Sequence, residues 1–194
     1  MSCGTPNLQQ VPKIGEYRRM FAAPEGRVLV WGDYSQIELR IAAQIAHDDA
    51  LLKAFESGED IHAVTARLVG VDRKVAKGLN FGLLYGMGAR RFAENSGLPI
   101  EEATEYRRKF FAAYPGLKAW HSTQLDDRGD PLRGETRTLA SRRRLDVRSF
   151  SDRLNSPVQG SGADGLKAAI AALFERDRPS DTFLELGEEE YPRT

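Results

Sequence analysis

The expected fold is decided by VLVWGDYSQIELR at residues 28–40, an apolar run that reaches an acid and then becomes polar. Val28–Val30 is a β-rich run and predicts a buried strand. A helix is expected to begin near Ser35, because apolar residues recur at helical spacing from there toward Phe55. The pattern therefore places Asp33 at the end of a strand, at a sheet edge where ligands commonly bind.

Asp33 allows two interpretations. Mg²⁺ prefers oxygen ligands and usually takes one or two carboxylates together with substrate phosphates. Asp33 and the backbone carbonyl of Tyr34 would supply half of such a site, and a triphosphate would supply the rest. The other interpretation is that Asp33 is an ordinary turn residue. The residue alone does not decide between the two.

Glu38 also has a structural explanation. Ser35-x-x-Glu38 matches a capping box, in which the serine caps a helix and the glutamate reaches back to it. This role accounts for both residues without a ligand. Taken alone, it is the favoured interpretation.

The segment RKVAKGLNFGLLYGMG at residues 73–88 predicts a helix from about Arg73 to Tyr85 with one distinctive face. Arg73, Lys77, Phe81 and Tyr85 are four residues apart, so each step drifts about 40° and the four form a slanting stripe. The cations would meet phosphates and the rings would meet flat bases. In the alternative, the aromatic side chains belong to the core and the cations form a solvated edge.

Three glycines interrupt the same segment, at Gly78, Gly82 and Gly86. An interior glycine costs a helix about 1 kcal/mol relative to alanine. Their number predicts a close approach to the helix backbone, which either a flat base pair or a neighbouring helix would satisfy.

Two amides flank a proline in RLNSPVQGSGADGLKAAI at residues 153–170. Pro157 predicts a turn that enters a last helix at about 162–176. Asn155 and Gln159 suit a minor groove, where base edges present mainly acceptors, and ordinary loop chemistry is the alternative. A short hairpin is expected just before, at GETRTLASRRRLDV, whose arginine cluster could follow a phosphate backbone.

The composition suits one soluble globular domain, with 194 residues of which 41% are hydrophobic and 29% charged. Lys and Arg equal Asp and Glu at 28 each, so net charge gives no argument for nucleic-acid binding. The single cysteine, Cys3, excludes an internal disulfide framework. No segment predicts a membrane span and the N-terminus shows no signal-peptide core, so a cytoplasmic location is expected.

Three motifs occur in order: DYSQIELR, then R-x-x-x-K-x-x-N-F-G-x-x-Y-G, then N-x-P-V-Q-G-x-x-A-D. Together they resemble the polymerase domain of family A DNA polymerases, the bacterial DNA polymerase I type. NLQQVP at 7–12, GEDIH at 58–62 and TLASRRR also resemble that family. The resemblance covers about residues 4–176, and it is specific because three long motifs agree in order and composition.

The resemblance implies template-directed DNA synthesis, in which two metal ions, with Mg²⁺ as cofactor, assist nucleotidyl transfer from a dNTP to a primer 3′-hydroxyl. Asp33 would be the first catalytic carboxylate and would bind both metal ions, with the Tyr34 carbonyl beside it. Lys77 would act in catalysis as a cation on the triphosphate. Glu38 would abut the sugar of the incoming nucleotide and exclude a 2′-hydroxyl.

The resemblance also implies which residues contact the nucleotide and the DNA. The nucleotide-binding residues would be Tyr34, Gln36, Glu38, His62, Arg73, Lys77, Phe81 and Tyr85. Phe81 would stack on the incoming base or sugar, Tyr85 would lie at the template position, and Gln36 would also face the duplex. The DNA-binding residues would be Arg40, Asn155 and Gln159. The implied partners are primer–template DNA and dNTPs.

The fold implied by the resemblance is α+β and helix-rich, a partial right-hand polymerase palm and fingers with a reduced antiparallel sheet. Residues 1–62 would be part of the palm with the first catalytic motif, and 63–115 would be the fingers with the nucleotide-binding helix. Residues 116–178 would return to the palm with the duplex-contacting segment. Residues 179–194 would be a divergent acidic tail.

The sequence departs from the family at the third catalytic motif, a His-Asp-Glu turn that follows the last helix. The histidines of this chain are His47, His62 and His121, and no His-Asp-Glu occurs. The acidic end looks truncated or rearranged. We therefore expect one metal site to be half built, and apolar surface near Val28–Val30 to be exposed because its neighbouring strands are missing.

Three functional hypotheses follow. The chain is an incomplete or impaired polymerase domain, a non-catalytic DNA- or nucleotide-binding remnant, or one piece of a split polymerase that a complementing fragment completes. Nucleotide binding without incorporation would favour the second hypothesis. Incorporation only after addition of the fragment would favour the third.

Overall fold

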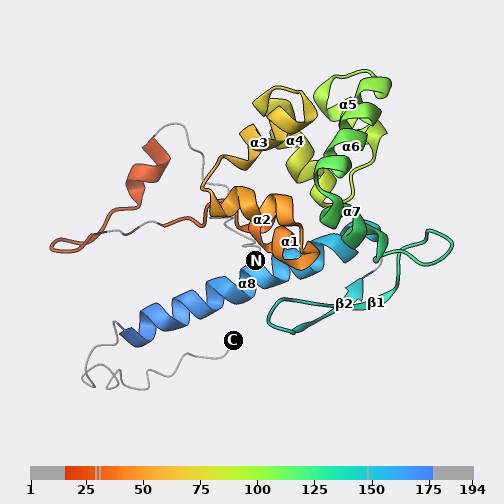
Figure 1. The fold of residues 1–194 in the computed structure, drawn as a ribbon. Helices are drawn as coiled ribbons and strands as arrows, with labels where there is room; N and C mark the ends of the chain where they lie inside the picture. Colours follow the sequence, from red (N-terminus) through yellow and green to blue (C-terminus); the bar gives the residue numbers. More distant parts are fainter. Residues whose placement is uncertain (1–15, 29, 31, 148, 177–194) are drawn as a thin grey trace, which may run out of the picture.

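A computed structural model describes residues 16–28, 30, 32–147 and 149–176 (Figure 1). The elements in chain order are a 3-10 helix η2 (Glu16–Met20), α1 (Ile37–Ala46), α2 (Asp49–Glu56), α3 (Ile61–Val69), α4 (Arg73–Leu84), α5 (Ala89–Ser96), α6 (Ile100–Ala113), α7 (Pro115–Ser122), β1 (Gly134–Arg137), β2 (Arg143–Val147) and α8 (Phe150–Arg176). The described residues are thus mostly helical, with one two-stranded antiparallel sheet. This confirms the expected helix-rich α+β fold with a reduced sheet.

The core lies among the helices α1 to α7 and the N-terminal half of α8 (Figure 1). Helix α3 packs on α4 and α6, α5 packs on α6, and α1 packs on α2, α7 and α8. The largest fully buried side chains include Tyr114, Phe110, Leu51, Ile61, Leu79, Leu83, Leu84 and Leu117. The helices that carry the three motifs, α1, α4 and α8, therefore share one core.

Short polar side chains and one glycine set the ends of α3 and the start of α4. Asp60 caps α3 by accepting a hydrogen bond from the backbone N–H of His62, and Gly70 ends that helix with a φ of 81°. Asp72 caps α4 by accepting from two backbone N–H groups of its first turn. Short polar side chains are favoured here because the first N–H groups of a helix have no partner inside it.

The single helix predicted after residue 35 is divided in two. His47 ends α1 in a left-handed conformation, and Asp48 begins α2 by accepting a hydrogen bond from a backbone N–H of that helix at 3.1 Å. The other carboxylate oxygen of Asp48 accepts from the backbone N–H of Leu117 in α7 at 2.9 Å. One buried carboxylate thus joins two helix N-termini. The two helices pack closely here, because a Cβ at Gly116 would lie only 2.7 Å from Asp48 Cα.

Two of the glycines in the 73–88 segment are closely approached by other side chains of the chain. A Cβ on Gly82 would meet Met87 Sδ at 2.9 Å, and a Cβ on Gly86 would meet the Phe150 ring of α8 at 2.7 Å. Gly86 follows α4 instead of lying inside it, with a φ of 79° that other residues rarely adopt. Packing within the chain therefore explains both glycines without a base pair.

The prediction that Pro157 forms a turn before a helix at 162–176 is wrong. Helix α8 runs unbroken over Phe150–Arg176 with Pro157 inside it. Pro157 and Val158 are buried, and the hydroxyl of Ser161 donates to the Pro157 carbonyl at 2.6 Å. Burial of this face offsets the one helical hydrogen bond that a proline cannot donate.

The predicted hairpin is confirmed as β1 and β2, which pair antiparallel with a bulge. Helix α8 holds its turn in place. The Thr138 hydroxyl donates to Asp164 at 2.8 Å, and the Leu139 backbone N–H donates to the Ser161 hydroxyl at 2.9 Å. The hairpin is therefore fixed to the same helix that carries the third motif.

The strand predicted at Val28–Val30 is wrong for the residues that the structure describes. Val28 and Val30 are 82% and 91% exposed, and residue 29 lies outside the described ranges. A strand needs a neighbour to pair its backbone groups, and β1–β2 is the one sheet among the described residues. The apolar exposure expected near this segment is confirmed.

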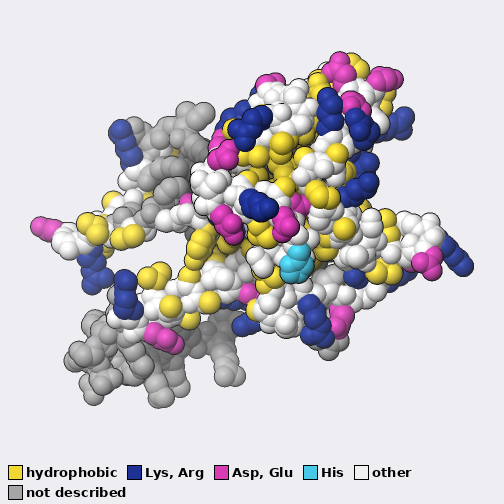
Figure 2. Space-filling model, viewed as in Figure 1, with side chains coloured by type: hydrophobic (Ala, Val, Ile, Leu, Met, Phe, Trp, Pro, Cys, Tyr) yellow, Lys and Arg dark blue, Asp and Glu magenta, His cyan; other side chains and the backbone are white. Residues whose placement is uncertain are grey.

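The C-terminal half of α8 also exposes apolar side chains. Leu166, Ile170, Leu173 and Phe174 recur at helical spacing and are between 38% and 67% exposed. Figure 2 shows hydrophobic side chains along this part of α8. We call these four residues the α8 stripe.

Some sequence predictions fall outside the described residues. NLQQVP at 7–12 and the acidic tail at 179–194 are among them. Within the described ranges, no helix combines the length and apolar character needed to cross a membrane.

Candidate functional site

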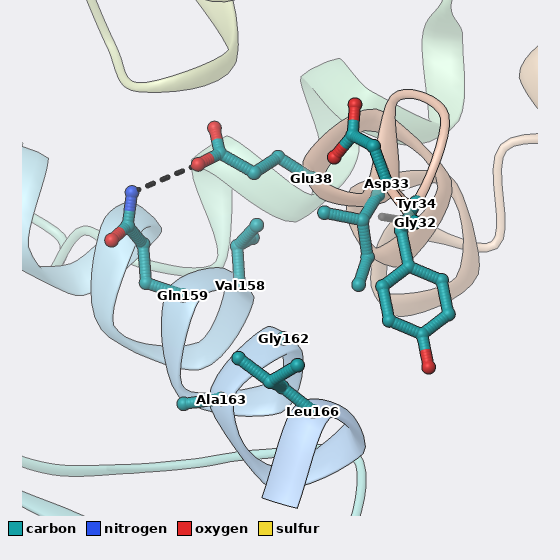
Figure 3. Close-up of a pocket in the computed structure, with 10 residues that line it drawn as sticks. Gly32, Asp33, Tyr34, Glu38, Val158, Gln159, Gly162, Ala163 and Leu166 are labelled. Carbon is teal, nitrogen blue, oxygen red and sulfur yellow. Dashed lines mark hydrogen bonds between the residues drawn. The ribbon is translucent and has the colours of Figure 1, made fainter. Parts of the chain in front are cut away.

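A cleft of about 420 Å³ opens between the start of α1 and the middle of α8 (Figure 3). It is lined by Gly32, Asp33, Tyr34, Ile37, Glu38, Val158, Gln159, Gly162, Ala163 and Leu166. The carboxylates of Asp33 and Glu38 lie toward one side of the cleft, and the Tyr34 ring is directed away from them (Figure 3). The structure therefore brings together predicted residues from the first and third motifs.

Glu38 joins three helices at this cleft. Its Oε1 accepts a hydrogen bond from Gln159 Nε2 of α8 at 3.0 Å, and its Oε2 accepts one from the Tyr85 hydroxyl at the end of α4. The capping-box prediction is wrong, because Gln36 rather than Ser35 precedes α1 and makes no side-chain cap. The Glu38 carboxylate is bonded across the cleft and not to its own helix.

Tyr85 is held as a neutral donor. Burial, together with its hydrogen bond to Glu38, raises the pKa of the phenol well above its ordinary value of 10.0. The backbone carbonyl of Tyr85 also accepts a hydrogen bond from the Ser151 hydroxyl at 3.1 Å. The end of α4 is therefore bonded to both α1 and α8.

The donors at Asp33 fit magnesium in kind. Asp33 is exposed beside the cleft, and the adjacent Tyr34 carbonyl is a second oxygen donor of the type that Mg²⁺ takes. Glu38, the other carboxylate of the cleft, already accepts a hydrogen bond at each oxygen. In the described part of the chain, no three Asp, Glu, His or Cys side chains gather in a group that could hold a metal ion. Of the two carboxylates that line the cleft, Asp33 is the one that does not accept hydrogen bonds at both oxygens from described residues.

The cations of the stripe on α4 lie at the other end of that helix. Arg73 Nε donates to Asp60 Oδ2 at 2.5 Å, and Lys77 is exposed one turn later. A helix rises 1.5 Å per residue, so Arg73 and Tyr85 are about 18 Å apart along the axis. The stripe therefore reaches the cleft through Tyr85, and its cations lie farther from Asp33.

His62 and Phe81 lie next to each other between these two ends. Their ring centroids are 5.8 Å apart, and His62 is only 4% exposed. Burial lowers the pKa of the His62 imidazole. The Asp60 carboxylate opposes this shift, and the Arg73 and Lys77 charges add to it. The imidazole is therefore uncharged at neutral pH.

A second cavity, of about 570 Å³, lies between α4 and α5. Phe81 and Gly82 line it from α4, and Phe92 and Leu98 line it from the α5 side. It shares no lining residue with the cleft at Asp33. The Phe81 ring thus borders both His62 and a separate apolar cavity.

The residues predicted to contact DNA lie in different surroundings. Gln159 lines the cleft, whereas Asn155 is half-buried and its Oδ1 has no hydrogen-bond partner among the described residues. Arg40 lies over the Phe55 ring at 4.5 Å, and its Nε donates to the Ser35 carbonyl at 3.0 Å. Arg40 is therefore engaged by α2 and by its own turn.

Sequence reasoning missed three buried polar residues near His62. Thr65, Asn80 and Tyr114 are linked to one another by hydrogen bonds, and Asn80 also contacts His62. A signal was available, because Asn80 is the one amide in α4 and a buried amide needs partners. Only the structure shows which partners it has.

Comparison with known proteins agrees with the motifs. Residues 1–182 match the sequence model of DNA polymerase family A. The chain belongs to this family. DNA polymerase I, thermostable, from Thermus thermophilus is 40% identical over 200 residues, which cover 91% of this chain and 24% of that protein. DNA polymerase I from Aquifex aeolicus (strain VF5) is 38% identical over 193 residues, which cover 90% of this chain and 32% of that protein.

A solved structure also resembles this family A chain. The POL domain of Pol1 from M. smegmatis, in complex with DNA primer-template and dNTP, superposes with a TM-score of 0.70 at 31% identity. The match covers 88% of this chain and 35% of that chain. The chain thus has the fold of part of a polymerase domain, and it spans only a fraction of the length of the relatives it matches.

Proposed function

We propose that this chain takes part in template-directed DNA synthesis, in which a nucleotide from a dNTP is added to a primer 3′-hydroxyl. The observation that carries the proposal is Glu38, bonded at once to Gln159 and Tyr85 beside Asp33. One residue from each of the three motifs meets there. The M. smegmatis relative, which was solved with DNA primer-template and dNTP, supports the same assignment.

Glu38 is the residue that selects the sugar. Two hydrogen bonds hold its carboxylate, so the side chain forms a fixed wall of the cleft. A 2′-hydroxyl pressed against this wall would collide with it or disturb the bonds to Tyr85 and Gln159. The base would lie toward Phe81, whose ring offers a stacking surface, and Tyr85 would occupy the template position.

The triphosphate binds along the exposed side of α4. Arg73 and Lys77 are cations one turn apart, and charge-assisted hydrogen bonds to phosphate oxygens are stronger than neutral ones. His62 lies between them and Phe81 and adds a neutral imidazole. Lys77 acts in catalysis by offsetting the negative charge that develops on the leaving pyrophosphate.

The bond that forms joins the primer 3′ oxygen to the α-phosphorus of the dNTP. The bond from that phosphorus to the bridging oxygen breaks, pyrophosphate leaves, and the hydroxyl proton passes to water. Asp33 and the Tyr34 carbonyl would hold magnesium, which when bound in a two-ion site stabilises the attacking and leaving oxygens. Asp33 therefore sets the position of the reacting end of the primer.

The duplex is contacted from the side of α1 and α8. Gln36, Arg40, Asn155 and Gln159 would face it, and the unsatisfied Oδ1 of Asn155 is an acceptor available to a base-edge or water partner. In the proposed architecture, residues 1–62 and 116–178 belong to the palm, and residues 63–115 form the fingers.

The 194-residue chain alone is expected to be an impaired enzyme, because the described cleft positions a single carboxylate for metal. A second candidate is one piece of a split polymerase. The exposed Val28, Val30 and the α8 stripe favour it, since apolar faces of this kind are usually covered. A fragment that supplied a second carboxylate would cover this face and complete the metal site.

Primer extension and dTTP binding test the proposal together. We expect the chain to bind dTTP with Mg²⁺ and to extend a primed template very slowly, with Asp33→Asn removing the residual extension. Brisk extension that Asp33→Ala abolishes would contradict the impairment. Absence of dTTP binding would contradict the nucleotide site, whereas binding without any extension would identify a binding remnant.

A further inference from the structure

Three buried polar side chains form a hydrogen-bonded chain that ends at the His62 ring. Tyr114 lies at the junction of α6 and α7, Thr65 lies in α3, and Asn80 lies in α4. All three are completely buried. Buried polar groups are costly unless each finds a partner, so their hydrogen bonds have a defined direction.

The contacts run in one line. Tyr114 Oη is 2.7 Å from Thr65 Oγ1, which is 2.9 Å from Asn80 Oδ1. Asn80 Nδ2 is 2.8 Å from His62 Nδ1. Thr65 Oγ1 also lies 2.8 Å from the Ile61 carbonyl of its own helix.

The orientation of the Asn80 amide gives this line its direction. Burial raises the pKa of Tyr114, so its phenol keeps its proton and donates to Thr65. The one hydrogen of the Thr65 hydroxyl faces two acceptors, the Ile61 carbonyl and the Asn80 amide oxygen. The Asn80 amide lies with its oxygen toward Thr65 and its nitrogen toward His62. An amide nitrogen only donates, so His62 Nδ1 must carry a lone pair.

We infer that the chain of Tyr114, Thr65 and Asn80 holds His62 as the neutral tautomer whose proton is on Nε2. The three are positioning residues, since they act on His62 and touch no substrate. The tautomer itself does not depend on the proposed function, and only its role in binding a triphosphate rests on that function. Under the proposed function, the group that His62 offers to a triphosphate oxygen would then be its Nε2–H.

Protonation of His62 would require the amide to turn over. An imidazolium carries a proton on Nδ1, which needs an acceptor, and only the Asn80 oxygen could provide one at that position. The charged groups that act on His62 are Asp60, Arg73 and Lys77, and the two cations oppose a positive ring. The polar chain and the local charges therefore favour the same neutral state.

Nitrogen-15 NMR of the full chain, labelled at histidine, tests the inference without any nucleotide. The His62 signals are assigned with His62→Gln. We expect an unprotonated Nδ1 and a protonated Nε2. A protonated Nδ1 in the unaltered chain at neutral pH would overturn the inference.

Asn80→Asp reverses the hydrogen bond with little change in shape. A carboxylate only accepts, so His62 should become protonated at Nδ1, and its titration midpoint should rise by about one pH unit or more. An unchanged tautomer and midpoint would overturn the inference.

The Thr65→Val and Thr65→Ser variants provide a second test that still applies if Asn80→Asp does not fold. Valine should give a mixture of tautomers because nothing orients the amide, and serine should restore the single Nε2–H form.

Titration with dTTP and Mg²⁺ separates this inference from the proposed function. If the tautomer is as expected but the unaltered chain binds no dTTP, the proposed function fails and the positioning role stands. If both hold, Thr65→Val should weaken dTTP binding several-fold, and Thr65→Ser should restore it. Restored binding without a restored tautomer would overturn the link between Thr65 and His62.

Discussion

Helices α3, α4 and α6 bury a shared set of apolar side chains together with polar ones such as Thr65 and Asn80. The residues before Asp33 and the α8 stripe instead leave apolar side chains exposed (Figure 2). The first region holds the proposed triphosphate residues. The second region borders the proposed metal site. The two regions are joined at Glu38, where α1, α4 and α8 meet.

Under the proposed function, nucleotide binding and catalysis would therefore depend on different parts of the fold. Helix α4 is supported by a core among the described helices. Asp33 is supported by an exposed segment that pairs with no described strand. Variants in the first region should therefore change stability strongly, and variants in the second should change it little.

The largest effect is expected for Leu79→Ala in α4. Leu79 is completely buried in the core, so the substitution leaves a cavity there. Leucine-to-alanine changes at such sites lower the free energy of unfolding by about 2–5 kcal/mol. Urea unfolding followed by circular dichroism measures the loss.

Leu173→Ala provides the matched control, because the same change is made at a side chain that is 53% exposed. We expect a loss below about 0.5 kcal/mol. Equal losses at the two positions would show that the C-terminal half of α8 is buried in solution, and the comparison of the two regions would fail.

A pH dependence of similar size is expected from His121. Its Nε2 donates to the Leu84 carbonyl at 3.2 Å, at the end of α4, and aromatic rings surround it. Burial lowers the pKa of His121 from 6.5 to about 4. Below 6.5 the unfolded chain therefore binds a proton that the folded chain does not bind until about 4. The free energy of unfolding should fall across this window by about 3 kcal/mol.

His121→Gln separates this contribution from other acid effects. Glutamine keeps an amide donor for the Leu84 carbonyl but does not titrate, so the slope between pH 6.5 and about 4 should become shallower. His47→Asn, at the exposed left-handed end of α1, should leave the slope unchanged. An identical slope in both variants would mean that His121 is accessible to protons in the folded chain.

A smaller effect is expected for Asp48→Ala. This carboxylate accepts from backbone N–H groups of both α2 and α7, and a helix cap contributes about 1 kcal/mol. We therefore expect a loss of about 2 kcal/mol, measured by urea unfolding. Asp72→Ala, an exposed cap that serves only α4, should lose about half as much. A smaller loss at Asp48 than at Asp72 would mean that the contact to α7 contributes nothing.

Local signals can be read from the sequence more easily than long-range partners can. The caps at Asp60 and Asp72 and the stop at Gly70 act within a few residues, so their chemistry is visible in the sequence. Pro157 was misjudged because burial of α8 outweighs a missing hydrogen bond, and burial is a tertiary effect. The strand at Val28–Val30 failed for the same reason, since a strand depends on neighbours.

The candidate site shows the same division. The spacing of the stripe on α4 predicted correctly that Arg73, Lys77, Phe81 and Tyr85 follow one helix. The spacing of Ser35 and Glu38 favoured a cap, but the carboxylate is bonded to residues 47 and 121 positions away. No local pattern shows partners at such separations, and the same holds for the contacts of Asn80.

The smallest effect on stability is expected for Lys77→Ala, and it bears most directly on function. Lys77 is exposed, so its loss should change the free energy of unfolding by less than about 0.5 kcal/mol. A hydrogen bond from a charged group contributes about 1.5 kcal/mol or more, so dTTP binding should weaken about tenfold or more. Calorimetric titration with dTTP and Mg²⁺ measures the change.

Lys74→Ala is the matched control, because it removes one positive charge from the same helix at a position off the stripe. Lys74 is also exposed on α4, but it lies off the stripe and borders the second cavity. Its removal should leave dTTP binding unchanged. If both lysines weaken binding equally, the effect is one of overall charge and not of position. If Lys77→Ala instead lowers the melting temperature strongly and leaves binding intact, α4 is a core helix with a solvated edge, and the region that looks complete has only a structural role.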